Sequence, residues 1–223
     1  MIGYPIGAVL GGYMYGNFGE KAALAQQYLA TQYNQVAEIE NALSVLKNIL
    51  GKSILELQLE RMMQSKHCGE IVVAISTNPN DNVLEELCNQ KDWKYFRGDE
   101  NDLLDRHYQC AKKYNADIVA KIPSDCPLID PDVIDKVFSY HFENDFDFTS
   151  NLHPASYPDG NDVEVFSFTA LEQAHKEAKK DLEREHTTPY FWEHPDKFSI
   201  GNILWETDQD FSMSHRFTID YQE

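Results

Sequence analysis

An acidic side chain follows directly on an apolar run in the segment KIPSDCPLIDPDVIDK, residues 121–136. Asp125 stands in a loop between two prolines, after the strand-forming run DIVA at residues 117–120. The Asp-Pro pair at residues 130–131 is typical of a helix N-cap followed by the first helical position. The pattern therefore places Asp125 at the carboxyl end of a strand, which is where open α/β sheets bind ligands.

The composition is that of a globular protein. A chain of 223 residues with 42% hydrophobic and 25% charged residues is long enough for one large domain or two small ones. The formal net charge of −18 excludes broad contact with nucleic acid or with an anionic membrane surface, because both bind Lys and Arg. It leaves room for a local cationic pocket that binds phosphate. Acidity that serves solubility alone is the simpler interpretation.

The cysteines and the apolar runs indicate a cytoplasmic protein. Four cysteines form no C-x-x-C pair, so neither a zinc site nor a disulfide scaffold is indicated. No apolar run is long enough to span a bilayer, and the apolar start lacks the basic residues of a signal peptide.

Strand and helix patterns alternate between residues 69 and 122. Runs rich in β-branched and aromatic residues predict strands, and apolar residues at helical spacing predict the helices between them. The predicted strands are 70–76, 93–96 and 117–122, and the predicted helices are 80–90 and 101–114. Such βαβαβ alternation predicts a doubly wound, mostly parallel sheet of the α/β class.

The part of the chain after residue 122 has a different pattern. A helix at 130–142 is followed by predicted strands at 146–151 and 162–168, by a helix at 170–180, and by a strand-like run at 197–205. This part is expected to supply an acceptor pocket and a dimer surface, so we expect a homodimer.

The first 44 residues are atypical. A Gly- and Tyr-rich start precedes one long helix candidate at residues 20–50, whose apolar stripe is expected to pack on its own domain or on a neighbour. The glycine pattern IGAVLGG follows no predicted strand, so it does not indicate a phosphate-binding loop. We expect an appendage at 1–44 and one domain at 45–223.

Seven blocks in order resemble the cytidylyltransferase family that activates acylneuraminate-type sugars, and especially its spore coat polysaccharide biosynthesis protein F branch. They are LGKSILELQLERM, IVVAISTNPNDNVLEELC, FRGDENDLLDRHYQCAKKY, DIVAKIPSDCPLIDPDVID, SNLHPASYPDGNDVEVFSFTALEQA, EREHTTPYFWEHPDKFSIGNI and HRFTIDY. The blocks cover roughly residues 45–221. The resemblance implies a GT-A-like nucleotidyltransferase fold that binds CTP and Mg²⁺, with attack of a sugar hydroxyl on the α-phosphate.

The resemblance implies a magnesium site of two carboxylates. Asp125 matches the family's first metal-binding aspartate, and Asp220 in HRFTIDY matches the second. A surface aspartate at a strand end is an equal alternative for Asp220. The family continues into a final helix, so we expect the C-terminus to be truncated. Lys52 matches the family's second Gly-Lys pair and is implied, with Asp125, to be catalytic.

The resemblance also implies two sets of binding residues. The residues near the nucleotide are Ser76, Thr77, Asn78, Arg97, Gly98 and Arg106. The residues near the sugar are Asp159, Asp162, Glu164, Glu183, Arg184 and His186. Simpler alternatives stay open: an ion pair with Asp102 on the helix surface for Arg106, a turn for Asp159-Gly160, and a solvated charge run for residues 183–186.

One departure from the family bears on activity. Members begin with a strand and an A-R-x-x-S-T-R-L-P-G-K loop that cradles the triphosphate, whereas Ser44 stands here where its lysine should be. We expect CMP transfer from CTP to a sugar for surface polysaccharide synthesis, with activity impaired. The alternatives are a catalytically degenerate paralogue acting as an assembly or regulatory subunit, and a GT-A glycosyltransferase, which the sugar-side blocks disfavour.

Overall fold

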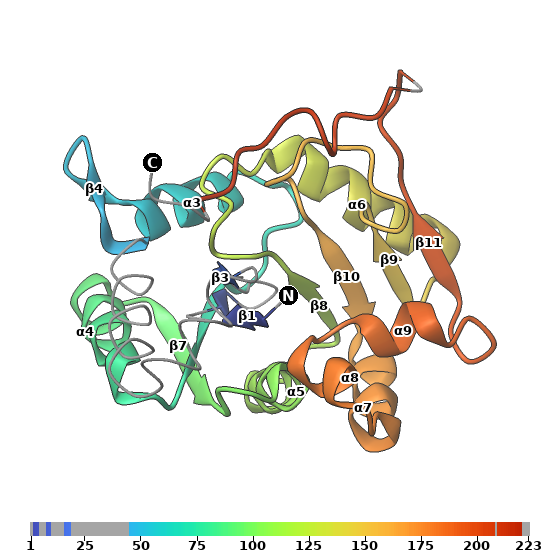
Figure 1. Ribbon diagram of the computed structural model, residues 1–223, viewed down its shortest axis with the longest axis horizontal. Helices are drawn as coiled ribbons and strands as arrows, with labels where there is room; N and C mark the ends of the chain where they lie inside the picture. The colour runs from blue at the N-terminus through green and yellow to red at the C-terminus, as the bar shows by residue number, and fades with distance from the viewer. Residues whose placement is uncertain (1, 5–7, 10–15, 19–44, 208, 220–223) are drawn as a thin grey trace.

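The computed structural model describes residues 2–4, 8–9, 16–18, 45–207 and 209–219. Most of the predicted helix at 20–50 lies outside the described residues. The strands lie between two groups of helices in Figure 1, with α3 and α6 on one side and α5, α7 and α8 on the other. Strands β1 (Ile2–Tyr4) and β3 (Gly16–Phe18) pair with each other antiparallel.

A β-α-β unit carries the nucleotide-side residues. Strands β6 (Val72–Ser76) and β7 (Lys94–Gly98) are parallel and are joined through η1 (Pro79–Asp81) and α4 (Asn82–Lys91). All five residues of β6 are buried, as expected for a run of β-branched side chains in a parallel sheet. The sequence prediction of these strands and this helix is therefore confirmed, with shifts of one or two residues at the ends.

The second sheet carries Asp125 and the sugar-side residues. Its strands are β8 (Ile118–Lys121), β9 (Phe148–Ser150), β10 (Glu164–Ser167) and β11 (Ile200–Asn202), in the order β11-β9-β10-β8. β10 is antiparallel to both of its neighbours, and β11 is parallel to β9. The described strands therefore form an α/β fold with mixed pairing, and not the single, mostly parallel sheet that the alternation predicts.

Alternate side chains of β6 explain why it lies between two helical layers. Val73 and Ile75 belong to a core shared with α3 (Ile54–Met62) and α6 (Pro131–Asn144), whereas Val72 and Ala74 pack with Leu103 of α5 (Leu103–Lys113). Successive strand residues point to opposite faces, so each face needs its own apolar layer. A third core contains α7 (Phe168–Glu177) and α9 (Pro189–Glu193).

Helix α6 begins as its sequence predicts. Asp130 is the N-cap, its side chain accepts a hydrogen bond from the Asp132 amide at 3.0 Å, and Pro131 occupies the first position. The helix ends at Asn144, two residues beyond the predicted end. Among the described residues, no helix combines the length and apolar character needed to cross a membrane.

The predicted long helix is wrong at its carboxyl end. Residues 48–53 form a hairpin of β4 (Asn48–Ile49) and β5 (Lys52–Ser53). At its tip Leu50 and Gly51 have φ angles of 53° and 89°. Two successive residues with positive φ are typical of a two-residue hairpin turn and cannot continue a right-handed helix. Ser53 then caps α3 by accepting from the Glu56 amide.

Gly98 allows the close packing of α5 on β7 and gives a first prediction. A Cβ atom at residue 98 would lie 2.6 Å from Cγ of Arg106, whereas one at Gly69 would meet no heavy atom within 4 Å. We expect Gly98→Ala to lower the free energy of unfolding by about 1–3 kcal/mol through overpacking, and Gly69→Ala to lower it not at all. Urea denaturation of both variants measures this, and equal stability of the two would contradict it.

Candidate functional site

Asp125 lies in the loop that follows β8, as the sequence predicts. The residue is only 5% exposed. The loop is held from two directions, because Gln58 of α3 donates to the Pro123 carbonyl at 2.5 Å and the Ile219 amide donates to the Asp125 carbonyl at 3.1 Å. The carboxylate is therefore fixed by backbone contacts on both sides rather than placed on a free loop.

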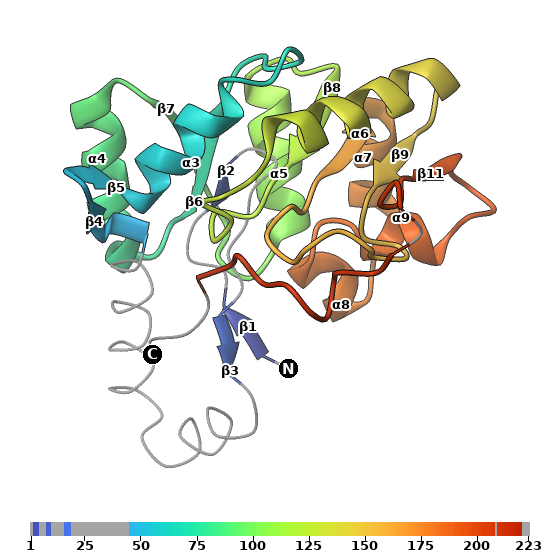
Figure 2. The same cartoon turned by 90° about the horizontal axis from the view of Figure 1, so that it is seen from above.

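The C-terminal segment runs beside this loop. The Asp159 amide donates to the His215 carbonyl at 3.0 Å, and the Phe217 amide donates to the Asp159 carbonyl at 2.8 Å. Nε of Arg216 lies 3.3 Å from a carboxylate oxygen of Asp159. Figure 2 shows this red segment crossing the molecule. Asp220 lies outside the described residues, so its predicted metal role stays a prediction.

The buried acids of this region repel one another. Burial, followed by repulsion from Asp162, raises the pKa of Asp125 to about 7. Burial, followed by repulsion from Asp159, raises the pKa of Asp162 to about 7 as well. Carboxylates whose charge is disfavoured in this way gain from a bound divalent cation, which takes oxygen ligands.

The described residues fit part of a magnesium site. Asp125 and Asp162 supply hard oxygen ligands of the kind that Mg²⁺ binds through one or two carboxylates. No group of three potential metal ligands gathers among residues 45–207 and 209–219. Asp125 and Asp162 would therefore hold the ion together with groups outside the described residues or on the substrate.

A buried ion pair lies at the neighbouring strand ends. Lys121 of β8 and Glu164 of β10 are direct cross-strand partners, and the lysine Nζ donates to the Glu164 carboxylate. Their side chains are 5% and 3% exposed. The Lys121 charge holds the pKa of Glu164 below its usual range despite burial. Asp162 lies two residues before β10, and the negative charge of Glu164 is among the causes that raise its pKa.

Two histidines flank this pair. His153 Nε2 lies 3.9 Å from a Glu164 oxygen. Burial first, and then the positive charge of Lys121, lower the pKa of His186 to about 4, so this histidine is neutral at pH 7. Neither Lys121 nor His153 is among the residues predicted from the sequence. A lysine inside the apolar run DIVAKI was the one available signal for Lys121, because a charge in a strand interior needs a partner.

The predicted nucleotide-side loop is an ordered turn at the end of β6. The Ser76 amide donates to Asp81, and the Ser76 hydroxyl accepts from the Asn78 amide at 3.0 Å. The Thr77 amide donates to the Gly98 carbonyl at 2.8 Å, which ties the turn to β7. Burial raises the pKa of Asp81 to about 6.

Arg97 stabilises the turn at the end of β6 through hydrogen bonds. Its Nε and Nη2 donate to the carbonyls of Ser76 and Asn78 at 2.9 and 2.8 Å, and its Nη1 lies 2.5 Å from Glu85. The guanidinium therefore positions the loop through its carbonyls. Its predicted contact with nucleotide stays a prediction.

The ion-pair alternative for Arg106 is wrong. Arg106 is completely buried on α5, and its charge opposes the rise in the pKa of Asp81. Asp102 instead accepts from Arg184 at 2.8 and 2.5 Å. Asp102 is the half-buried N-cap of α5, whereas Arg106 is one turn further into the helix and faces inward.

Within the charge run at 183–186, Glu183 and Arg184 are bonded to other parts of the fold, so the solvated alternative is wrong for these two residues. Glu183 is 2% exposed and accepts from the amides of Lys179 and Lys180 at 2.9 and 3.1 Å, which caps α8 (Asp181–Glu185). Arg184 joins α8 to α5 through Asp102 and also donates to the His175 carbonyl at 2.9 Å. Of this run, His186 is the residue that reaches the electrostatic field of Lys121 and Glu164.

Lys52, the other predicted catalytic residue, is paired on the β4–β5 hairpin. Its Nζ lies 2.5 Å from Glu60 of α3, and that hydrogen bond raises the pKa of the lysine. Its side chain is 44% exposed. The described contacts do not bring it to Asp125, so its predicted role stays a prediction.

The fold is that of a nucleotidyltransferase. The chain superimposes on CMP:2-keto-3-deoxy-manno-octonic acid synthetase in complex with CTP, with a TM-score of 0.54 at 13% identity, covering 77% of this chain and 87% of that one. At this identity the likeness shows the fold alone. A cytidylyltransferase from Leptospira borgpetersenii is more similar, with a TM-score of 0.74 at 32% identity over 80% of this chain and 74% of that one.

Sequence comparison gives the family. A family profile described as cytidylyltransferase matches residues 44–223, so the chain belongs to the cytidylyltransferase family. It is 41% identical over 156 residues to an uncharacterized protein of Methanocaldococcus jannaschii, covering 70% of this chain and 63% of that protein. The match thus spans less than two thirds of that relative. The chain is also 27% identical over 184 residues to the spore coat polysaccharide biosynthesis protein SpsF of Bacillus subtilis, and this match covers 80% of this chain and 75% of that one.

The raised pKa values predict how stability depends on pH. Asp125 and Asp162 titrate near pH 7 when folded and near 3.8 when unfolded. The folded protein then binds more protons between these values, so in magnesium-free buffer the free energy of unfolding falls as pH rises from about 4 to 7. We expect Asp125→Asn to remove much of that fall and to be more stable than wild type at pH 8, by about 1–4 kcal/mol.

Urea denaturation between pH 4 and 8 in the presence of a chelator measures this slope. The exposed Asp196→Asn is the matched control and should leave the slope as in wild type. An Asp125→Asn slope that equals the wild-type slope would show that Asp125 is not repelled in this way.

The buried ion pair predicts that losing one partner costs much more stability than losing both. We expect Lys121→Met to cost about 3–5 kcal/mol of stability at pH 7, because it leaves the buried Glu164 charge without its lysine. The double variant Lys121→Met, Glu164→Leu should recover most of that loss. Lys176→Met, which breaks an exposed pair with Glu172, is the control and should change stability little. Additive losses in the double variant, measured by urea denaturation, would argue against a coupled pair.

Proposed function

We propose that the protein transfers CMP from CTP to a hydroxyl of a sugar or sugar acid in surface polysaccharide biosynthesis. The observation that carries the proposal is the family match over residues 44–223, together with buried carboxylates gathered at the carboxyl end of β8. The relative SpsF, named for spore coat polysaccharide biosynthesis, supports the substrate class. We also propose that the protein acts in the cytoplasm, as a homodimer.

The proposed reaction forms one P–O bond and breaks another. The acceptor oxygen attacks the α-phosphorus of CTP, pyrophosphate leaves, and the hydroxyl proton passes to a base. Asp125 and Asp162 would hold Mg²⁺, which when bound neutralises the charge that builds up on the phosphates. Asp220 is a further proposed ligand.

The neutral His186 and the charged Glu164 lie on the acceptor side, and neither is well suited to take the proton. His186 has a pKa of about 4, so it is a weak base at pH 7, whereas Glu164 keeps its charge because Lys121 is its partner. A base works best when its pKa lies near the working pH. We therefore favour these side chains for orienting the acceptor hydroxyl, with the other sugar-side residues Asp159, Glu183 and Arg184 shaping that side.

One observation favours a second candidate, a catalytically degenerate paralogue that acts as an assembly or regulatory subunit. Two cations expected near the phosphates are already engaged by protein acids, Lys52 by Glu60 and Arg97 by Glu85. Ser44 also stands where the family's loop has lysine. Fewer available phosphate contacts reduce both triphosphate affinity and transition-state stabilisation by several kcal/mol, so impaired activity belongs to the proposal.

Calorimetric titration of CTP decides between the two candidates. We expect binding that requires Mg²⁺ and that weakens at least tenfold in Asp125→Asn, because the ion loses a charged ligand. Asp196→Asn is the control and should bind as wild type. Wild-type protein that binds no CTP at millimolar concentration with Mg²⁺ would sink the enzyme and leave the regulatory subunit.

If CTP binds, a pyrophosphate-release assay over a panel of sugars and sugar acids tests the reaction itself. Release that depends on both CTP and an acceptor supports CMP transfer. Turnover of a nucleotide sugar without pyrophosphate would instead identify a glycosyltransferase.

A further inference from the structure

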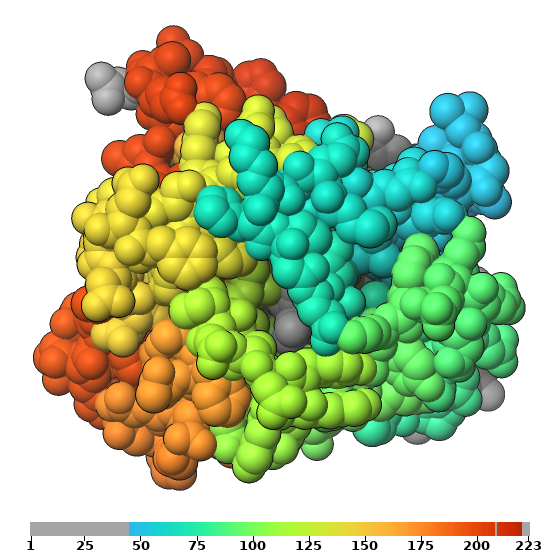
Figure 3. Space-filling model, turned by 180° about the vertical axis from the view of Figure 1, so that it is seen from behind, coloured from blue at the N-terminus to red at the C-terminus, as the bar shows by residue number. Residues whose placement is uncertain are grey.

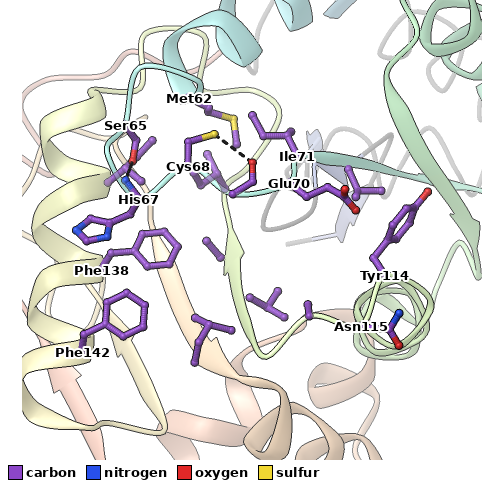
Figure 4. A pocket seen from close by; sticks show the side chains of 18 residues that line it. Met62, Ser65, His67, Cys68, Glu70, Ile71, Tyr114, Asn115, Phe138 and Phe142 are labelled. Atoms are coloured by element: carbon purple, nitrogen blue, oxygen red, sulfur yellow. Dashed lines mark hydrogen bonds between the residues drawn. The ribbon is translucent and has the colours of Figure 1, made fainter.

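A cavity of about 420 Å³ beside α6 is separate from the proposed site. Figure 3 shows the face of the molecule that is hollowed there. In Figure 4, Phe138 and Phe142 of α6 lie on one side of the cavity, and Tyr114 at the end of α5 lies across from them. Its described lining includes none of the residues proposed above to bind metal, nucleotide or sugar. The acceptor is therefore expected beside Glu164 instead.

The cations of the acceptor side already face carboxylates of the protein. Lys121 of β8 is the cross-strand partner of Glu164, and its Nζ donates to that carboxylate. Nε of Arg216 lies 3.3 Å from a carboxylate oxygen of Asp159. Because the Lys121–Glu164 pair is buried, separating it would leave two uncompensated charges inside the protein. A substrate anion therefore does not gain Lys121 as a partner.

The other basic groups of this side are engaged or uncharged. Arg184 donates to Asp102 at 2.8 Å and to the His175 carbonyl at 2.9 Å. His186 is neutral at pH 7, and burial lowers the pKa of His153 below its usual value. A neutral histidine offers a substrate a hydrogen bond but no charge.

The sequence limits what the rest of the chain can add. Among the residues that the structure does not describe, Lys21 is the single basic side chain. The same residues contain several acids, among them Glu20 and Asp220. The undescribed residues could therefore bring one positive charge to the acceptor side, against the acids already there.

Glu164 has an oxygen to which a ligand can donate. Its Oε2 accepts from Lys121, whereas its Oε1 is buried and accepts no hydrogen bond from the described residues. Nε2 of His153 is 3.9 Å from Oε1, beyond hydrogen-bond range, and the Thr188 side chain favours the charge of the same carboxylate. A buried acceptor atom without a donor is unfavourable. Because His153 is exposed, a hydroxyl that takes its place can reach Oε1 from solvent.

We propose that the acceptor is a sugar without a carboxylate or a phosphate group, and that one of its hydroxyls donates to Glu164. This inference rests on the proposed function and narrows its acceptor from sugars and sugar acids to uncharged sugars. A sugar hydroxyl supplies the donor that Oε1 lacks. A carboxylate would face Glu164 and Asp159 and would find the nearby cations engaged. The site thus selects by repelling the wrong ligand as well as by attracting the right one.

Matched pairs of sugars test the acceptor class. Glucose, galactose, mannose and N-acetylglucosamine are each compared with the uronic acid that differs from them at one carbon. Saturation-transfer NMR measures binding to the full-length protein with Mg²⁺ and a CTP analogue that cannot be cleaved between the α- and β-phosphates. We expect the uncharged member of a pair to bind about tenfold or more tightly, because like charges placed together weaken binding. Tighter binding of the acids, or no binding of any sugar, would overturn the inference.

Pyrophosphate release from CTP separates this inference from the proposed reaction. Release that is faster with the uncharged members supports both. Release that is confined to the acids would support the reaction and overturn the acceptor class. Binding of uncharged sugars without any release would overturn the reaction, while the binding itself would still support the ligand class.

Glu164→Gln tests the role of the carboxylate. The change removes the negative charge and leaves Lys121 to a substrate anion, so we expect discrimination against the acids to fall about tenfold or more. Glu143→Gln, at an exposed position of α6, is the control and should discriminate as wild type. Unchanged discrimination in Glu164→Gln would overturn the role of Glu164. If this variant fails to fold, Lys121→Met with Glu164→Leu takes its place, and wild-type binding of uncharged sugars there would overturn that role.

Discussion

The desolvation of Asp125 is the constraint around which the site is organised. A carboxylate that is 5% exposed loses most of its hydration, and its neighbours Asp162 and Asp159 add repulsion. The fold holds its loop in place nonetheless, because the Gln58 side chain bonds to the Pro123 carbonyl and the Ile219 amide to the Asp125 carbonyl. These backbone contacts fix the position of the loop without neutralising the side chain. The fold thus keeps a carboxylate whose charge is unfavourable, and such strongly shifted groups are common at functional sites.

The Lys121–Glu164 pair determines which acids of the site stay ionised. By pairing across β8 and β10, Lys121 keeps one acid of the cluster ionised while Asp125 and Asp162 are pushed towards neutrality. The same lysine lowers the pKa of His186. Neighbouring acids with opposite pKa shifts are typical of sites in which one group binds a cation or carries a proton and another keeps its charge.

Local patterns in the sequence predicted local structure well. The β-branched run of β6, the helical spacing of α5 and the Asp-Pro start of α6 each act within a few residues, and each is confirmed. Features that depend on distant partners could not be obtained in this way. The antiparallel pairing of β10 with β8 depends on a register between residues more than forty positions apart. Leu50 at positive φ overrides a helical apolar stripe.

For the candidate site as well, the sequence predicted what depends on adjacent residues and did not predict what depends on packing. Sequence placed Asp125 at a strand end correctly, because its flanking signals are adjacent to it. It could not reveal that Arg97 is committed to the carbonyls of Ser76 and Asn78, or that Arg184 bonds to Asp102, because both depend on packing. The acidic groups near β8 and β10 are Asp125, Asp159, Asp162 and Glu164, and the cations beside them are Lys121 and Arg216. A triphosphate brought to such a surface would be repelled unless a divalent cation came with it, so the proposed nucleotide site depends on the proposed metal site.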